Sequence, residues 1–296
     1  MRWPVKPAMT REELAMTREK PRKASPPTLI GGLALLFCLL TACSQERTVR
    51  IPTRFIELAN EELLSPNPDL LDRYNWAIVL EYPDSIIDNK NISYPALCDT
   101  LKENVLREIF GKETVLKARN GELPPSKRLR NDDNAFVREV KILADHFNAR
   151  LQSNYPAARD TLRGDLFYEV DVNGYLAGTW KDYVSYHIHL REDEFGQVHA
   201  WERGYNYALD GRRIYEADLF QKKGWESELS GLLTETFHQN FKTRDIPLHT
   251  APVRPNGNFK FAPGGIIWMY DAGEIAEARY GILRITLPWN TLQNLI

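Results

Sequence analysis

The chain has 296 residues, of which 43% are hydrophobic and 26% are charged, and its formal net charge is −2. The first 28 residues contain seven Lys or Arg and three Glu, so the chain from Cys43 onward carries a net charge of −6. This acidic balance excludes nucleic acid as a main partner, because phosphate contacts need a basic face.

An uncharged segment near the N-terminus ends in a cysteine. Residues 29–42 contain no charged side chain and follow a basic stretch. A helix of this length rises only about 21 Å, which is short of the roughly 30 Å hydrocarbon core of a bilayer. The segment Leu40-Thr41-Ala42-Cys43 resembles the lipobox of bacterial lipoproteins. We therefore predict a signal peptide over residues 1–42 and a membrane anchor of acyl chains on Cys43.

Two details refine this prediction. The motif Ala-Met-Thr-Arg-Glu occurs at residues 8–12 and again at 15–19, which places the expected true start at Met16. Ser44 follows the lipidated cysteine and favours the outer membrane or a periplasm-facing position in the cell envelope.

Cleavage before Cys43 and acylation of this residue leave only Cys98 free, so a disulfide within the mature chain is excluded.

The mature chain begins with polar and proline-containing sequence. Residues 43–72 are predicted to form a lipidated tether with one short strand near residues 54–58. A strand is expected over residues 76–82. Helices are expected from the proline-started residues 95–110 and over residues 133–154, where Pro156 ends the apolar stripe.

From residue 160 the hydrophobic pattern alternates with a period of two. Strands are predicted over residues 166–172, 184–190, 198–209, 266–270 and 280–287, and a helix over 225–241. The mixture of helices and hairpins predicts an α+β fold, with an antiparallel sheet and helices packed on one side. We divide it into an N-terminal α+β part (73–159) and a C-terminal domain (160–296).

The C-terminal domain contains a series of short motifs. In order they are Gly196-Gln197-Val198-His199, Asn206-Tyr207, Asp210-Gly211, Asp218-Leu219-Phe220, Tyr270, Glu274-Ile275-Ala276, Gly281 and Leu287-Pro288-Trp289. This series resembles the C-terminal domain of the RsiV-like family. The chain departs from the family pattern where Gln197 and Val198 replace Gly-Ala and where Ala208 replaces an Asp.

The resemblance has implications for function. The family includes the extracellular part of a lysozyme-sensing anti-sigma factor and a domain that precedes the catalytic unit of some peptidoglycan deacetylases. It implies an α+β envelope-facing binding module more than an enzyme. His199, Asn206, Tyr207, Tyr270 and Glu274 are the binding or structural residues that the resemblance implies.

Three histidines suggest an alternative. His187 and His189 share one face of a predicted strand, and His199 lies on the expected partner strand, so three imidazoles could converge on a zinc ion. No His-Glu-x-x-His or Cys-x-x-Cys motif accompanies them, and a solvated sheet face is the favoured explanation of His187 and His189. The alternative is a metal-dependent hydrolase or deacetylase of wall polymers.

Other residues have structural interpretations beside functional ones. A hairpin-fixing His199 and a buried Glu274 that accepts turn amides are favoured over catalytic roles. The aromatic C-terminal half fits a sheet core, a protein interface or sugar stacking. We therefore expect a membrane-anchored binding module for peptidoglycan or a lysozyme-like protein, with no cofactor and no catalytic residue. A purely structural envelope lipoprotein is a further alternative.

Overall fold

The computed structural model describes residues 48–65, 70–249 and 251–296, which belong to one compact unit. The predicted signal peptide and Cys43 lie outside these residues. No helix in the described ranges is long and apolar enough to cross a membrane. The strands are β1 (Val49–Arg50), β2 (Thr53–Leu63), β3 (Arg73–Pro83), β4 (Ile87–Asp88), β5 (Phe167–Trp180), β6 (Tyr183–Glu194), β7 (Gln197–Ala208), β8 (Phe259–Ala262), β9 (Gly265–Tyr270) and β10 (Leu283–Pro288). The α-helices are α1 (Pro95–Phe110), α2 (Lys112–Arg119), α3 (Ala135–Thr161), α4 (Glu216–Leu219), α5 (Trp225–Phe241) and α6 (Trp289–Leu292).

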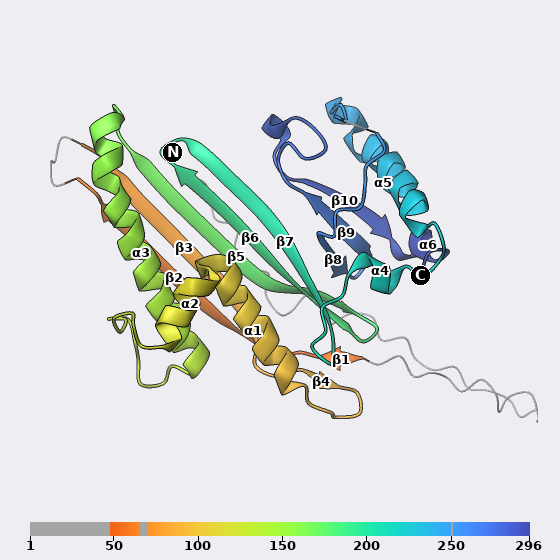
Figure 1. Cartoon of the computed structure of the whole chain (residues 1–296), viewed down its shortest axis with the longest axis horizontal. Helices are drawn as coiled ribbons and strands as arrows, with labels where there is room; N and C mark the ends of the chain where they lie inside the picture. Colours follow the sequence, from red (N-terminus) through yellow and green to blue (C-terminus); the bar gives the residue numbers. More distant parts are fainter. Residues whose placement is uncertain (1–47, 66–69, 250) are drawn as a thin grey trace, which may run out of the picture. The chain divides into compact units, whose positions relative to one another are not determined.

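A five-stranded main sheet has the strand order β2-β3-β5-β6-β7. Every pair in it is antiparallel except β3 and β5, which are parallel because α1, α2 and α3 connect them. All three helices lie on one face of the sheet (Figure 1). The predicted class, an antiparallel-rich α+β fold with helices on one side, is confirmed.

Alternating side chains explain why the helices cover that face. On β6, Val184, Tyr186 and Ile188 are at most 1% exposed, and they belong to the same apolar core as Leu101 of α1 and Val140 of α3. Side chains at alternate strand positions point to opposite sides. The other face of the main sheet consequently carries polar residues.

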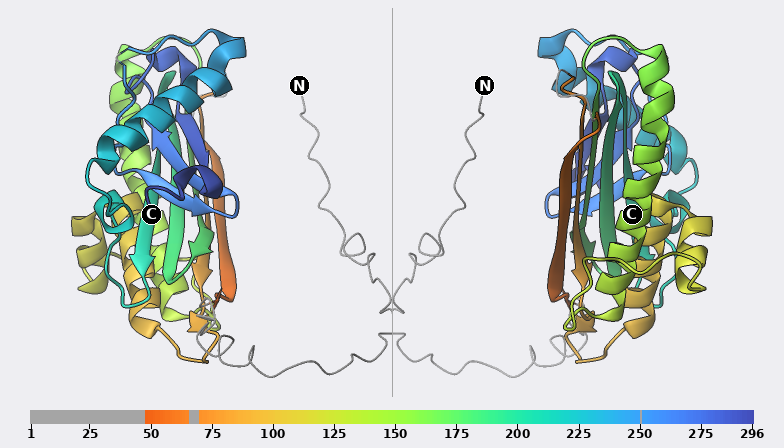
Figure 2. Two further views of the ribbon diagram at one scale, coloured as in Figure 1. Left: turned by 90° about the vertical axis from the view of Figure 1, so that its right-hand side faces the viewer. Right: turned by 90° about the vertical axis from the view of Figure 1, so that its left-hand side faces the viewer.

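A smaller sheet packs on this polar face. Its order is β10-β9-β8, and β8 lies against β5, β6 and β7. Helix α5 covers the smaller sheet, while α3 runs beside the long strands of the main sheet (Figure 2). The smaller sheet and α5 form a second apolar core around Trp268, Phe259 and Leu233. Strand β8 is absent from the pattern-based prediction because its four residues are too few to show a period.

Two predicted segments need correction. The short strand expected near residues 54–58 is longer in the structure, where residues 53–63 form the edge strand β2 and place Ile56 and Leu58 in the main core. The helix expected to end at residue 154 continues through Pro156 to Thr161. Its last turns are fixed by the buried Asp72, whose carboxylate accepts hydrogen bonds from Tyr155 at 2.5 Å and Arg159 at 2.9 Å.

The expected boundary between residues 159 and 160 falls inside the main sheet. β3 precedes this position and β5 follows it, yet eight residue pairs join the two strands in parallel register. The strands of the N-terminal part and those of the C-terminal part therefore share one core.

Candidate binding groove

The three histidines do not converge. In the antiparallel pair of β6 and β7, His187 is opposite Gly204, His189 is opposite Glu202, and His199 is opposite Glu192. Directly opposed residues share a face of the sheet. His187 and His189 therefore lie on the polar face, whereas His199 lies on the helix-covered face near its exposed end. The alternative in which the three imidazoles share one metal ion is therefore not formed, and no metal-binding group of three or more His, Cys, Asp or Glu occurs among the described residues.

His187 and His189 instead contact the buried carboxylate of Glu202. His187 Nε2 lies 3.4 Å from Glu202 Oε2, and His189 Nδ1 lies 3.2 Å from Oε1. Arg284 of the smaller sheet donates from Nε to Oε2 at 2.7 Å and from Nη2 to Oε1. Burial alone would raise the pKa of Glu202, but the bonds from His187 and Arg284 outweigh it and hold this pKa well below its usual value. Glu202 thus joins the two sheets as a charged acceptor.

Asn206 also joins the two sheets. It is 1% exposed; its Oδ1 accepts a hydrogen bond from Ser185 Oγ at 2.6 Å, and its Nδ2 donates to the Phe259 carbonyl at 2.7 Å. The motif residue therefore aligns β8 across β6 and β7. Buried amides need such partners, since an unpaired one is costly.

The two motif tyrosines are buried in different cores. Tyr207 accepts a hydrogen bond from Asn104 of α1 at 2.6 Å on the helix side of the main sheet. Tyr270 donates to the carbonyl of Arg254 at 3.0 Å in the second core. Neither ring is accessible to a ligand, so both tyrosines contribute to the structure rather than to a binding surface.

Glu274 is exposed rather than buried, which corrects one expectation. It does accept a turn amide: Oε2 bonds with the backbone N–H of Asp271 at 2.8 Å, and Oε1 bonds with Asn256 Nδ2 at 2.9 Å. The carboxylate ties the turn after β9 to the loop before β8. Its remaining surface lies in a groove.

This groove has a volume of about 620 Å³ and lies where β7 meets the loops around the smaller sheet. Its lining residues are Arg203, Gly204, Tyr205, Arg213, Tyr215, Asn256, Gly257, Asn258, Asp271 and Glu274. We call it the motif groove, because it includes Glu274 and the β7 residues that directly precede Asn206-Tyr207.

Gly204 allows the floor of the motif groove to form. A Cβ atom at this position would lie 1.9 Å from the Phe259 carbonyl oxygen, so only glycine lets β7 and β8 approach this closely. The Gly204 N–H donates to Asn258 Oδ1 at 3.0 Å, and Asn258 Nδ2 donates to the Glu202 carbonyl at 2.7 Å. A glycine inside a strand is the sequence signal that could have revealed this approach.

Two arginines give the motif groove its charge. Arg203 forms a bidentate pair with Asp271, with both N–O distances at 2.8 Å. The Arg213 guanidinium lies 4.5 Å from the centre of the Tyr205 ring and donates to the Gly204 carbonyl at 3.2 Å. No carboxylate pairs with Arg213 within the described ranges. Arg213 is half-buried and lines the groove, and Tyr215, which also lines it, is 59% exposed.

A second hollow, of about 540 Å³, is lined by Glu216, Trp225, Glu226, Ser227, Ser230, Pro252, Arg254 and Pro255. The loop of residues 252–258 borders both hollows. Burial raises the pKa of Glu216, although bonds from Trp268 and Gly257 oppose the rise. Glu216 is not among the residues predicted from sequence, because nothing in the local pattern separates it from the solvated acids around it.

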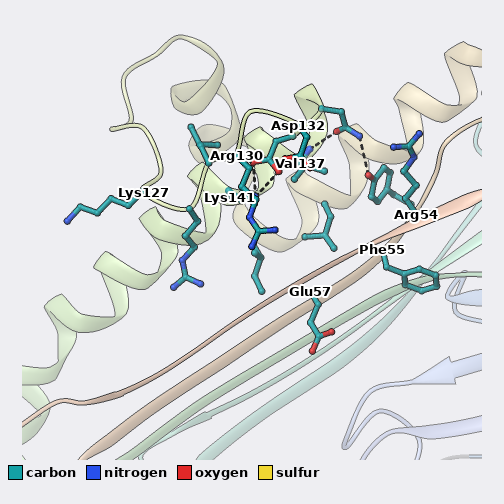
Figure 3. A pocket seen from close by; sticks show the side chains of 15 residues that line it. Arg54, Phe55, Glu57, Lys127, Arg130, Asp132, Val137 and Lys141 are labelled. Atoms are coloured by element: carbon teal, nitrogen blue, oxygen red, sulfur yellow. Dashed lines mark hydrogen bonds and ion pairs between the residues drawn. The ribbon is translucent and has the colours of Figure 1, made fainter. Parts of the chain in front are cut away.

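A third hollow, of about 750 Å³, lies beside the edge strand β2 (Figure 3). Within it Lys141 pairs with Asp133 at 2.7 Å, and Arg54 pairs at 3.0 Å with Asp84, which lies outside the lining. It contains none of the motif residues. We therefore place the candidate site in the motif groove.

Comparison with known proteins finds a family match within the C-terminal part of the chain. The α+β architecture defines the class of protein. Residues 217–290 match the family described as "Protein of unknown function (DUF3298)". No curated protein matches the sequence.

Two solved structures are similar to this one. A member of the DUF3298 family from Bacteroides fragilis NCTC 9343 has a TM-score of 0.60 and 18% identity, over 83% of this chain and 93% of that chain. A DUF3298 family protein from Pseudomonas aeruginosa PAO1 has a TM-score of 0.47 and 13% identity, over 83% and 94% of the two chains. The first likeness extends the shared fold well beyond residues 217–290.

Proposed function

We propose that this chain is a bacterial envelope lipoprotein, anchored through Cys43, whose body is a binding module for a cell-wall glycan or an envelope protein such as lysozyme. The motif groove is the observation that carries the binding function. It combines an arginine that has no carboxylate partner among the described residues with an exposed tyrosine and fixed asparagine and carboxylate groups. These are the polar and aromatic groups that recognise ligands. The RsiV-like motifs and the lipobox support the envelope setting.

Binding tests the central claim. The full chain in detergent micelles is titrated calorimetrically with lysozyme and, separately, with soluble peptidoglycan fragments. We expect one of the two to bind and Arg213→Ala to weaken its affinity about ten-fold, as loss of a charged hydrogen-bond donor does. Arg212→Ala is the matched control, because Arg212 is adjacent but pairs with Asp218 outside the groove. If neither probe binds, the proposal is wrong.

The anchor is tested separately. Mass spectrometry of the protein from bacterial membranes should find a mature N-terminus at Cys43 that carries acyl chains, and Cys43→Ser should release the protein from the membrane. Cys98 is an internal control, since it is free and buried and its pKa is raised by burial. An intact N-terminus with an unmodified Cys43 would contradict the anchor.

The alternatives predict other results. A wall-polymer hydrolase that uses zinc at His187, His189 and His199 is disfavoured, because His199 lies on the opposite face of the sheet. Stoichiometric zinc in the purified protein would support the hydrolase alternative. A purely structural lipoprotein would bind neither probe and would cross-link to an envelope complex in cells.

A further inference from the structure

The second hollow has a polar wall that is fixed in place by the fold. Glu216 is 9% exposed, and its Oε1 accepts hydrogen bonds from Trp268 Nε1 at 2.6 Å and from the Gly257 N–H at 3.3 Å. No partner for Oε2 occurs among the described residues. Since Glu216 also lines the hollow, its carboxyl group is oriented by two protein donors and presents its second oxygen to a ligand.

The facing wall is aromatic. Trp225 is half-buried at the start of α5 and lines the same hollow. The ring of Phe220 packs against it with a centroid distance of 5.4 Å and an interplanar angle of 33°. This contact limits the orientations of the indole and leaves part of its surface toward the hollow. Arg254 and Ser227 are exposed at the rim and add hydrogen-bonding groups.

The combination discriminates between ligand classes. A free anion would meet two carboxyl groups, Glu216 and Glu226, and a free cation would meet Arg254. A neutral polyhydroxylated ring satisfies both walls, because its C–H face packs on an aromatic ring and its hydroxyl groups bond with fixed polar atoms. The volume of about 540 Å³ is sufficient for one or two sugar units.

We propose that this hollow is a saccharide subsite, in which a sugar ring packs on Trp225 and a hydroxyl group donates to Glu216 Oε2. This inference rests on the proposed binding function and names a glycan as the ligand class. The loop of residues 252–258 borders the motif groove as well, so a glycan chain that occupies the subsite can extend along this loop into the groove.

The test uses the full chain in detergent micelles and a soluble chito-oligosaccharide as the probe. Titration calorimetry should detect binding to the wild type. Glu216→Gln should lower the affinity about ten-fold, because the amide can keep the bonds to Trp268 and Gly257 but replaces the free acceptor with a donor. Trp225→Ala should lower it by a similar factor through loss of the aromatic wall. Glu226→Gln, at the exposed rim, should change it less than about two-fold.

Folding is checked by thermal unfolding, and Glu216→Gln should unfold at no lower temperature than the wild type at pH 7. The outcomes separate the two proposals. A probe that does not bind overturns the saccharide subsite, but binding of lysozyme would leave the proposed function intact. Saccharide binding that survives Glu216→Gln and Trp225→Ala but is lost in Arg213→Ala also overturns the subsite, and places the sugar in the motif groove. If chito-oligosaccharide, peptidoglycan fragments and lysozyme all fail to bind, both proposals fail.

Discussion

The two faces of the main sheet are joined to their neighbours by different forces. On one face, α1 and α3 pack through apolar side chains such as Leu80 and Ile78, both of which are 0% exposed. On the other face, the smaller sheet is held by buried polar groups, among them Glu202 and Asn206. We call this second contact the polar seam. Apolar packing tolerates small shifts, whereas hydrogen bonds depend on direction. The polar seam therefore fixes the position of β8 and its loops, and with it the shape of the motif groove.

The largest expected effect comes from forcing the polar seam apart. Gly204→Ala should lower the free energy of unfolding by about 3 kcal/mol or more, because the added methyl group would lie 1.9 Å from the Phe259 carbonyl oxygen and the backbone must move. Denaturant unfolding measures this. Gly231→Ala in α5 is the matched control: it has open space around it and should stabilise the protein by about 0.5 to 1 kcal/mol. If Gly204→Ala were as stable as the wild type, the polar seam would tolerate small shifts as well as the apolar core does.

A smaller effect is expected when the charge at the centre of the polar seam is removed. Glu202→Gln should lower the free energy of unfolding by about 2 kcal/mol. A hydrogen bond to a charged group contributes about 1.5 to 3 kcal/mol, and the amide nitrogen that replaces one carboxylate oxygen cannot accept the bond that Arg284 donates to that oxygen. Glu169→Gln on the same sheet face is the control. Glu169 also pairs with an arginine, but its side chain is 46% exposed, so the loss should be below about 1 kcal/mol. Equal losses in urea titrations would contradict the distinction between the seam and the open face.

The fold could be predicted largely from periodicity. The helix expected over residues 225–241 has these bounds in the structure, and the alternation of residues 184–190 marks the buried side of β6. The length of the edge strand β2 was underestimated, because its second half, residues 59–63, alternates only weakly between apolar and polar side chains. Pro156 was misread as a helix end, since local sequence cannot show that the distant Asp72 fixes the following turn.

The candidate site was less predictable, because it depends on strand pairing. His187, His189 and His199 differ in face only once the register of β6 and β7 is known. Glu216 becomes distinctive only through burial by Trp268, which is 52 residues away in sequence. Residue types were visible from the start, but their partners were not.

The pH dependence of stability offers a third test of the polar seam. Burial lowers the pKa of His187 in the folded protein, although nearby Glu202 opposes the shift and Lys260 adds to it. The unfolded chain takes up a proton near pH 6.5, so stability is lost as the pH falls below this value. We expect His187 to account for about 1 kcal/mol of loss between about pH 7 and pH 5.5.

Unfolding of wild type and His187→Gln across this range measures the difference. The variant should show the shallower decline, and His199→Gln, at an exposed position, should follow the wild type. A parallel decline in wild type and His187→Gln would mean that the buried imidazole does not contribute.

The smallest effect on stability is expected at the rim of the motif groove, where the Arg203–Asp271 pair is bidentate but 35% and 37% exposed. A double-mutant cycle of Arg203→Ala and Asp271→Ala should give a coupling energy below about 1 kcal/mol, because solvent screens exposed pairs. The same variants should still weaken ligand binding, since both side chains line the groove. A coupling energy of about 2 kcal/mol or more would mean that this pair at the rim stabilises the fold as much as the buried carboxylate of Glu202 does. The rim would then be part of the polar seam, and its charges would serve the fold rather than a ligand.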